Sequence, residues 1–145
     1  MSGPIRDVRA SDVPPEDVEW LLGEEEPMIP TQGITHVAGV RATTKTTFSC
    51  WLAARATAKG INVFFASAED DVASCIRPRM EAAGADLDRV FFPDETDVPL
   101  RFPIDAGRLD RYVRERQIGL VILDPLSAFV RRDPMAAMLR GRTGW

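Results

Sequence analysis

The segment from Val37 to Thr47 has the residue types and the spacing of a loop that binds phosphate groups. Such a loop consists of a glycine, four further residues and then Gly-Lys-Ser/Thr, placed between an apolar strand and a helix. Its backbone N–H groups surround the phosphates, its lysine reaches the β- and γ-phosphate oxygens, and its hydroxyl group binds Mg²⁺. Here Gly39, Lys45 and Thr46 stand at these positions. The predicted phosphate-binding residues are Gly39, Val40, Arg41, Ala42, Thr43, Thr44, Lys45, Thr46 and Thr47.

The loop departs from this pattern at one position, because Thr44 stands where the second glycine is expected. That glycine lets the backbone approach the phosphates closely and adopt conformations that a side chain disfavours. If Thr44 has a positive φ, we expect about 1–2 kcal/mol of strain from its β-branched side chain. Two interpretations remain open: a weakened loop that still binds nucleotide, and a former loop that no longer does.

The segments on either side of the loop fit this interpretation. Residues 34–38 form a short apolar run that predicts a strand, bounded by glycine on both sides. From Lys45 the apolar residues recur at helical spacing, and Lys59-Gly60 is typical of a helix end. The N-terminus of that helix would direct free N–H groups and the positive end of its dipole at the phosphates.

Two acidic residues follow apolar runs that are typical of buried parallel strands. Glu69 comes shortly after residues 61–67, and Asp124 comes directly after residues 118–123. Parallel α/β sheets place their ligands at the carboxyl ends of their strands. We therefore interpret Glu69 as a base or water-orienting group for attack on a γ-phosphate. Asp124 would hold Mg²⁺ together with Thr46.

The other segments alternate between strand and helix patterns. Asp70 or Asp71 is expected to cap a helix that runs through Met80 and ends at Gly84. Residues 90–92 predict a third strand. The further predictions are a short helical or turn segment at residues 11–22, a polar loop at 93–103 and a helix at 104–117. Strands and helices in this order predict an α/β fold with a mostly parallel sheet flanked by helices.

Composition sets limits on the kind of protein. A chain of 145 residues with 45% hydrophobic residues is long enough for one core. The net charge is −4, and residues 1–30 hold eight acidic and two basic groups, which excludes a strongly basic nucleic-acid module. Cys50 and Cys75 lie in helical patterns without metal-ligand spacing, so buried structural thiols are expected. The sequence has no bilayer-length apolar run and no signal-peptide pattern, so we expect a soluble cytoplasmic protein without a membrane partner.

Several ordered motifs together resemble a known group of proteins. The chain is similar to the AAA-type, RecA-like ATPases of bacterial plasmids, phages and integrated elements. These resemble hexameric replicative helicases of the RepA type and often lie beside primase modules. The resemblance covers roughly residues 11–130. It rests on Val18-Glu19-Trp20-Leu21, Val37-Ala38-Gly39, Lys45-Thr46-Thr47, Ser67-Ala68-Glu69-Asp70-Asp71, Ile76-Arg77-Pro78-Arg79, Glu81-Ala82-Ala83-Gly84-Ala85 and Ile122-Leu123-Asp124-Pro125-Leu126.

The resemblance implies a RecA-like P-loop core that binds ATP and Mg²⁺ and hydrolyses ATP, with DNA as a partner. It implies Lys45 and Thr46 for phosphate and Mg²⁺, Glu69 as the catalytic carboxylate and Asp124 as the Walker B acid. It favours an ATPase over a small-molecule kinase with a similar loop. The alternative function is a non-catalytic remnant that binds nucleotide weakly or not at all.

The domain organisation follows from these assignments. Residues 1–30 are expected to form an acidic extension and connector, residues 31–130 a partial RecA-like domain, and residues 131–145 an irregular tail. The family would continue after Asp124 with a further helix and a strand, for which this chain has no good candidate. We therefore expect a core that is incomplete at its C-terminus, from a truncated or decayed gene product. Such a core would form homo-oligomers or pair with an intact homologue.

Overall fold

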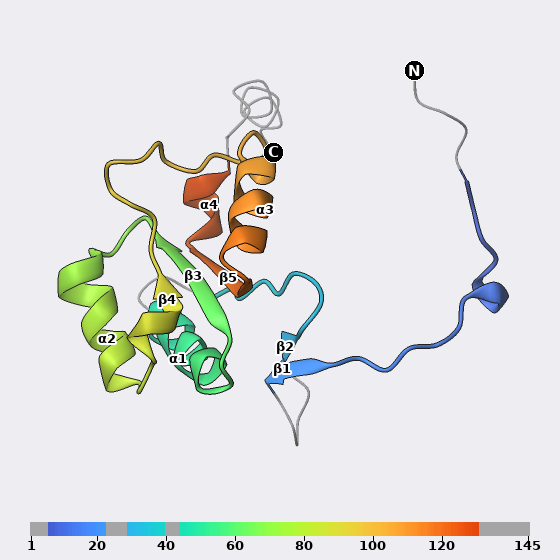
Figure 1. The fold of residues 1–145 in the computed structure, drawn as a ribbon, viewed down its shortest axis with the longest axis horizontal. Helices are drawn as coiled ribbons and strands as arrows, with labels where there is room; N and C mark the ends of the chain where they lie inside the picture. Colours follow the sequence, from blue (N-terminus) through green and yellow to red (C-terminus); the bar gives the residue numbers. More distant parts are fainter. Residues whose placement is uncertain (1–5, 23–28, 40–43, 131–145) are drawn as a thin grey trace, which may run out of the picture. The chain divides into compact units, whose positions relative to one another are not determined.

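The computed structural model describes residues 6–22, 29–39 and 44–130. The chain divides into two compact units, Met1–His36 and Val37–Trp145. Figure 1 shows the elements of both along the chain. The first unit contains a 3-10 turn (Ala10–Asp12), β1 (Trp20–Leu22) and β2 (Ile29–Pro30). The second contains α1 (Lys45–Ala58), β3 (Asn62–Ser67), a π-helical turn (Val72–Ile76), α2 (Arg77–Ala82), a 3-10 turn (Leu87–Arg89), β4 (Val90–Phe91), α3 (Ala106–Glu115), β5 (Ile118–Asp124) and α4 (Leu126–Phe129).

The described part of the first unit is organised by one antiparallel strand pair. β1 pairs with β2, with Trp20 opposite Pro30. The helical or turn segment expected over residues 11–22 is therefore wrong at its C-terminal end. Residues 20–22 are extended because they pair with β2, a partner that the local pattern does not specify, and Leu21 and Leu22 are buried.

The second unit contains a three-stranded parallel sheet in the order β4-β3-β5. Phe64 lies opposite Phe91 on one side and Val121 on the other. At the carboxyl end of the sheet, Ser67 lies opposite Asp124. The expected α/β fold with parallel strands flanked by helices is thus confirmed, and this arrangement is compatible with a RecA-like core.

The two faces of the sheet are covered by different helices, as Figure 1 shows. On one face Phe64 and Ala66 are buried together with Ile118 and Phe129, and apolar side chains of α3 pack against them. Val63 and Phe65, both fully buried, alternate with these residues and point to the other face. There α1 contacts β3 and β5, and α2 contacts α1. The helices therefore form one layer on each side of the sheet.

Helix α1 matches the expected helix from Lys45, and Gly60 follows its end with a φ of 79°. Its buried face is built largely from small residues, with Ala53 and Ala56 fully buried. Trp51, which belongs to the predicted apolar stripe, is 38% exposed. Among the helices of the described ranges, none is long and apolar enough to cross a membrane.

The strand expected at residues 34–38 is wrong. These residues form no ladder, and Ile34 is 96% exposed. A strand is stable only where a neighbouring strand pairs with its backbone groups. Within the described residues, the parallel sheet consists of β4, β3 and β5, with β5 paired only with β3. Residues 34–38 are therefore not part of it. The expected tail at residues 131–145 lies outside the described residues, and the expected domain boundaries at 30 and 130 stay predictions.

Candidate functional site

The N-terminus of α1 carries the described part of the predicted phosphate-binding loop. Lys45 is the first residue of the helix, and its Nζ atom donates a 3.1 Å hydrogen bond to the carbonyl oxygen of Gly39. This bond directs the lysine side chain toward Gly39, which precedes the helix in the chain. Thr46 is half-buried in the first turn, and Thr47 is exposed. Of the predicted loop residues, Val40, Arg41, Ala42 and Thr43 lie outside the described residues.

Thr44 has a negative φ. Its φ is −67° and its ψ is 32°, so the strain expected for a positive φ does not arise. Its carbonyl oxygen accepts the first helical hydrogen bond from the Phe48 N–H at 2.8 Å, while its side chain makes no capping bond. The threonine hydroxyl therefore does not satisfy the free N–H groups of the first turn.

The carboxyl ends of β3 and β5 bring the two predicted acidic groups to one edge of the sheet. The N–H of Ala68 donates a 3.0 Å hydrogen bond to the carbonyl oxygen of Asp124, one residue beyond the Ser67–Asp124 register pair. Glu69, the next residue along the chain, is exposed. Because the two strands are parallel neighbours, Glu69 and Asp124 leave the sheet at the same edge.

Among the described residues, the Oδ2 atom of Asp124 is a buried side-chain oxygen that accepts no hydrogen bond. An orphaned carboxylate oxygen is costly unless a cation, a water molecule or a donor completes it. In the described part of the chain no three His, Cys, Asp or Glu side chains come together as a metal cluster. Proteins usually hold Mg²⁺ through one or two carboxylates together with water and phosphate oxygens, so a single carboxylate is compatible with such an ion.

The buried thiol of Cys50 links α1 to this edge of the sheet. The Cys50 side chain is 1% exposed, and burial raises the pKa of its thiol to about 11. The charges of Arg79, Asp124 and Asp70 also act on this pKa, in that order. Cys50 lies in α1, which packs against β3 and β5.

The loop between β3 and the π-helical turn is held by its own side chains. Ser67 Oγ donates to the carbonyl oxygen of Asp70 at 3.0 Å and accepts from the Asp70 N–H at 3.2 Å. Asp71 caps the π-helical turn by accepting a 2.7 Å hydrogen bond from the Ser74 N–H. The hydrogen bonds from Ser74 hold the pKa of the Asp71 carboxyl below its usual value of 3.8. The expectation that Asp70 or Asp71 is a helix cap is thus confirmed for Asp71.

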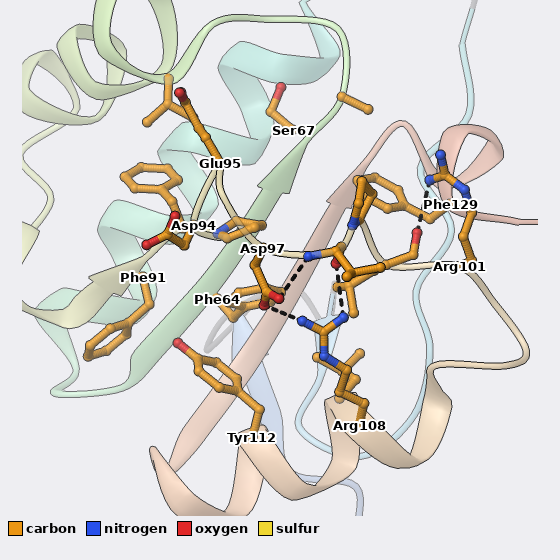
Figure 2. Close-up of a pocket in the computed structure, with 18 of the residues that line it drawn as sticks. Phe64, Ser67, Phe91, Asp94, Glu95, Asp97, Arg101, Arg108, Tyr112 and Phe129 are labelled. Atoms are coloured by element: carbon orange, nitrogen blue, oxygen red, sulfur yellow. Dashed lines mark hydrogen bonds and ion pairs between the residues drawn. The ribbon is translucent and has the colours of Figure 1, made fainter.

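A cavity of about 940 Å³ lies on the α3 side of the sheet, away from the predicted loop. Figure 2 shows Phe64, Phe91 and Tyr112 along it, with Arg108 directed at Asp97. Arg108 forms an ion pair with Asp97 and donates to the carbonyl oxygen of Val98 at 2.9 Å, which ties α3 to the loop above the cavity.

The cavity and the predicted site meet at the loop after β3. Gly39, Lys45, Thr46, Glu69 and Asp124 are not among the cavity's lining residues. Ser67, Ala68, Asp70 and Asp71 do line it. Sequence reasoning missed this cavity, because residues 93–103 were predicted only as a polar loop. The paired aromatic residues just before that loop, Phe91 and Phe92, were the available signal.

Comparison with known proteins identifies the family. The family model of the AAA domain matches residues 4–138. No curated protein and no solved structure matched the chain. The family match includes the predicted loop, the helix that follows it and both strands that lead to Glu69 and Asp124. The protein therefore belongs to the AAA domain family, a family of AAA-type P-loop ATPases.

Proposed function

We propose that this protein binds ATP with Mg²⁺ at the N-terminus of α1 and hydrolyses it. The observation that carries the proposal is the buried Oδ2 atom of Asp124 at the carboxyl edge of β5, which has no hydrogen-bond partner among the described residues. Helix α1 packs against β5, Lys45 begins that helix, and the Nζ atom of Lys45 is bonded to the carbonyl oxygen of Gly39. A lysine, a helix N-terminus and such a carboxylate together suit a nucleoside triphosphate and its metal ion.

Each proposed residue has a separate task in the reaction. A water molecule attacks the γ-phosphorus atom, the bond from that atom to the β-phosphate oxygen breaks, and ADP leaves. Glu69 orients the water and accepts its proton, and Lys45 offsets charge on the γ-phosphate oxygens. Thr46 and Asp124 would hold Mg²⁺, which supplies further positive charge to the phosphates. The N–H groups of the first turn of α1 bind the phosphates.

The first experiment measures binding by thermal unfolding at increasing concentrations of Mg-ATP. A ligand that binds only the folded state adds about 2.7 kcal/mol of stability at one hundred times its dissociation constant. We expect the unmodified protein to respond, and Thr44→Gly to respond at lower ATP concentration because the threonine side chain no longer limits the approach of the phosphates. Lys45→Ala should lose the response.

The matched control is Lys59→Ala at the other end of α1. The helix has 14 residues, so the two lysines lie about 20 Å apart along its axis. The control variant should keep the full response to Mg-ATP. If the unmodified protein and Thr44→Gly both fail to respond, the chain does not bind nucleotide and the remnant interpretation stands.

Phosphate release separates an ATPase from a protein that only binds. Glu69→Gln should bind Mg-ATP as the unmodified protein does and lose about 100-fold or more in the rate of phosphate release. Phosphate release without any acceptor also distinguishes hydrolysis from small-molecule kinase activity. Binding without release in the unmodified protein would leave a non-catalytic nucleotide-binding protein.

The finer assignment follows from the resemblance to replication helicases of mobile elements. We propose that ATP hydrolysis here is coupled to work on DNA, in an assembly with other copies or with an intact homologue. The coupling to DNA is tested by measuring whether single-stranded DNA stimulates phosphate release. The assembly is tested by measuring the size of the protein by light scattering. A monomer with a DNA-independent rate would contradict this assignment and leave the ATPase proposal intact.

A further inference from the structure

The backbone around Glu69 is fixed by a side-chain bond that closes a small loop. Ser67 Oγ bonds to both the N–H and the carbonyl oxygen of Asp70, at 3.2 Å and 3.0 Å. Glu69 lies directly before Asp70, and its side chain is exposed. The position of Glu69 therefore depends on how firmly Asp70 is held.

Arg79 of α2 reaches back to hold Asp70. Its Nη1 atom lies 3.0 Å from Asp70 Oδ2, and the two side chains are 40% and 34% exposed. Asp70 lies in the loop after β3, and Arg79 lies nine residues later, in α2. This ion pair restrains the loop from outside, in addition to the two Ser67 bonds within it.

A second ion pair on the same helix gives a direct comparison. Arg77 lies 3.3 Å from Glu81, and these side chains are 61% and 51% exposed. Both partners lie within one helix, so this pair restrains no loop. Arg77 and Arg79 therefore lie on one helix. In the described part of the chain, the ion pair of Arg79 reaches the loop that carries Glu69, whereas the ion pair of Arg77 stays within α2.

The loop that carries Glu69 is also attached to the strand that ends at Asp124. The N–H of Ala68 in the same loop bonds to the carbonyl oxygen of Asp124. The loop is thus attached to β5 at one end and to α2 at the other.

We propose that Arg79 is a positioning residue that acts through Asp70 to hold Glu69 at the carboxyl edge of the sheet beside Asp124. This inference rests on the proposed ATPase function, in which Glu69 orients the attacking water. Water activation depends on small distances, and a misplacement of about 1 Å can cost about 100-fold in rate. Binding of Mg-ATP depends on the loop at Lys45 and not on Glu69. Loss of Arg79 should therefore reduce turnover without weakening binding.

The test compares Arg79→Gln with Arg77→Gln in the full chain. We expect Arg79→Gln to lower kcat for ATP hydrolysis about tenfold or more and to change the dissociation constant of Mg-ATP less than about threefold. Arg77→Gln should change neither. In the Glu69→Gln background, Arg79→Gln should cause no further loss, because a residue that acts only through Glu69 has nothing left to position.

Hydrogen exchange without nucleotide examines the same link independently of activity. The N–H of Asp70 should exchange about tenfold faster in Arg79→Gln than in the unmodified protein, and Arg77→Gln should leave it unchanged. Equal exchange in Arg79→Gln and the unmodified protein would overturn the inference whatever the activity.

Failure of the proposed function and failure of this inference give different results. No phosphate release from the unmodified protein would overturn the proposed function and, with it, the role of Glu69. Normal phosphate release with an unchanged kcat in Arg79→Gln would overturn this inference alone. An additional loss in the Glu69→Gln background would also overturn it, because Arg79 would then act by another route.

Discussion

The backbone N–H of Ala68 donates a 3.0 Å hydrogen bond to the carbonyl oxygen of Asp124. This bond extends the β3–β5 ladder past the last register pair, Ser67 and Asp124. It holds the beginning of the loop that carries Glu69 against the end of the neighbouring strand. The two carboxylates proposed to serve ATP hydrolysis are therefore positioned by one sheet edge, although 54 residues separate them in the chain.

Asp124→Asn should increase the stability of the ligand-free protein by about 1 kcal/mol, since it removes a charge whose buried oxygen has no partner in the described part of the chain. We expect ATP with Mg²⁺ to stabilise the unmodified protein more than ATP with EDTA does. In Asp124→Asn the two should stabilise the protein equally. Urea unfolding with and without each ligand measures both effects. Asp110→Asn is the control, because Asp110 is exposed on α3 and pairs only with Arg114 in the described residues. Lower ligand-free stability in Asp124→Asn would contradict an uncompensated charge.

Asp71 should stabilise the protein in a pH-dependent way. Hydrogen bonds from Ser74 lower the pKa of its carboxyl below 3.8, so its charged form is favoured in the folded state. A lowered pKa gives stability that is present above the unfolded-state value and is lost as the pH falls through the folded-state value. At pH 7 we expect Asp71→Ala to lower the midpoint of thermal unfolding, and Asp71→Asn to lower it less because asparagine also caps.

The distinguishing measurement for Asp71 is a series of midpoints from pH 7 down to about pH 2.5, a range that spans the ordinary aspartate pKa of 3.8. The difference in unfolding midpoint between the unmodified protein and Asp71→Asn should disappear as the pH falls below that value. A gap that stays constant with pH would show that the charge of Asp71 does not contribute.

The two cysteines should differ in their reactivity toward a thiol reagent. Cys50 is buried and its pKa is raised to about 11, whereas Cys75 is half-buried. At pH 8 about one Cys50 thiol in a thousand would be ionised, and the thiolate is the reactive form. In the native protein we expect one thiol to react, and Cys75→Ser to suppress that reaction until the protein is unfolded. Equal rates in Cys50→Ser and Cys75→Ser would contradict this difference in burial.

Two glycine-to-alanine substitutions should have opposite effects. A Cβ atom at Gly119 would lie 2.7 Å from Ile61 Cγ2, whereas a Cβ atom at Gly107 has no such neighbour within 4 Å. Gly119→Ala should therefore destabilise the protein by about 1–2 kcal/mol. Gly107→Ala lies in α3 and should stabilise it by about 0.5–1 kcal/mol.

The Gly119 effect can be assigned to one contact by a double-mutant cycle. In an Ile61→Ala background, Gly119→Ala should cost less than in the unmodified protein, because the clashing methyl group is gone. Chemical denaturation of the four proteins measures this coupling. An unchanged cost would place the strain somewhere other than Ile61.

Local patterns predicted one helix and the two strands that are buried in the sheet. The helix from Lys45, the buried strand before Glu69 and the strand before Asp124 appear close to their expected positions. Residues 34–38 were also predicted as a strand from their pattern and form none. A strand differs from a helix in this respect, because its hydrogen bonds come from a partner that the local pattern does not specify.

The sequence by itself determined which chemical groups are available and how they are spaced: the Gly39, Lys45 and Thr46 pattern and an acidic residue after each of two buried strands. Only the tertiary structure decided that Thr44 has an unstrained φ, that an oxygen of Asp124 is buried without a partner in the described residues, and that Arg79 holds Asp70. The physical reason is the distance along the chain over which each property is set. Residue type and spacing are local properties of the chain, whereas strand register, burial and ion pairs between elements depend on how distant segments pack together.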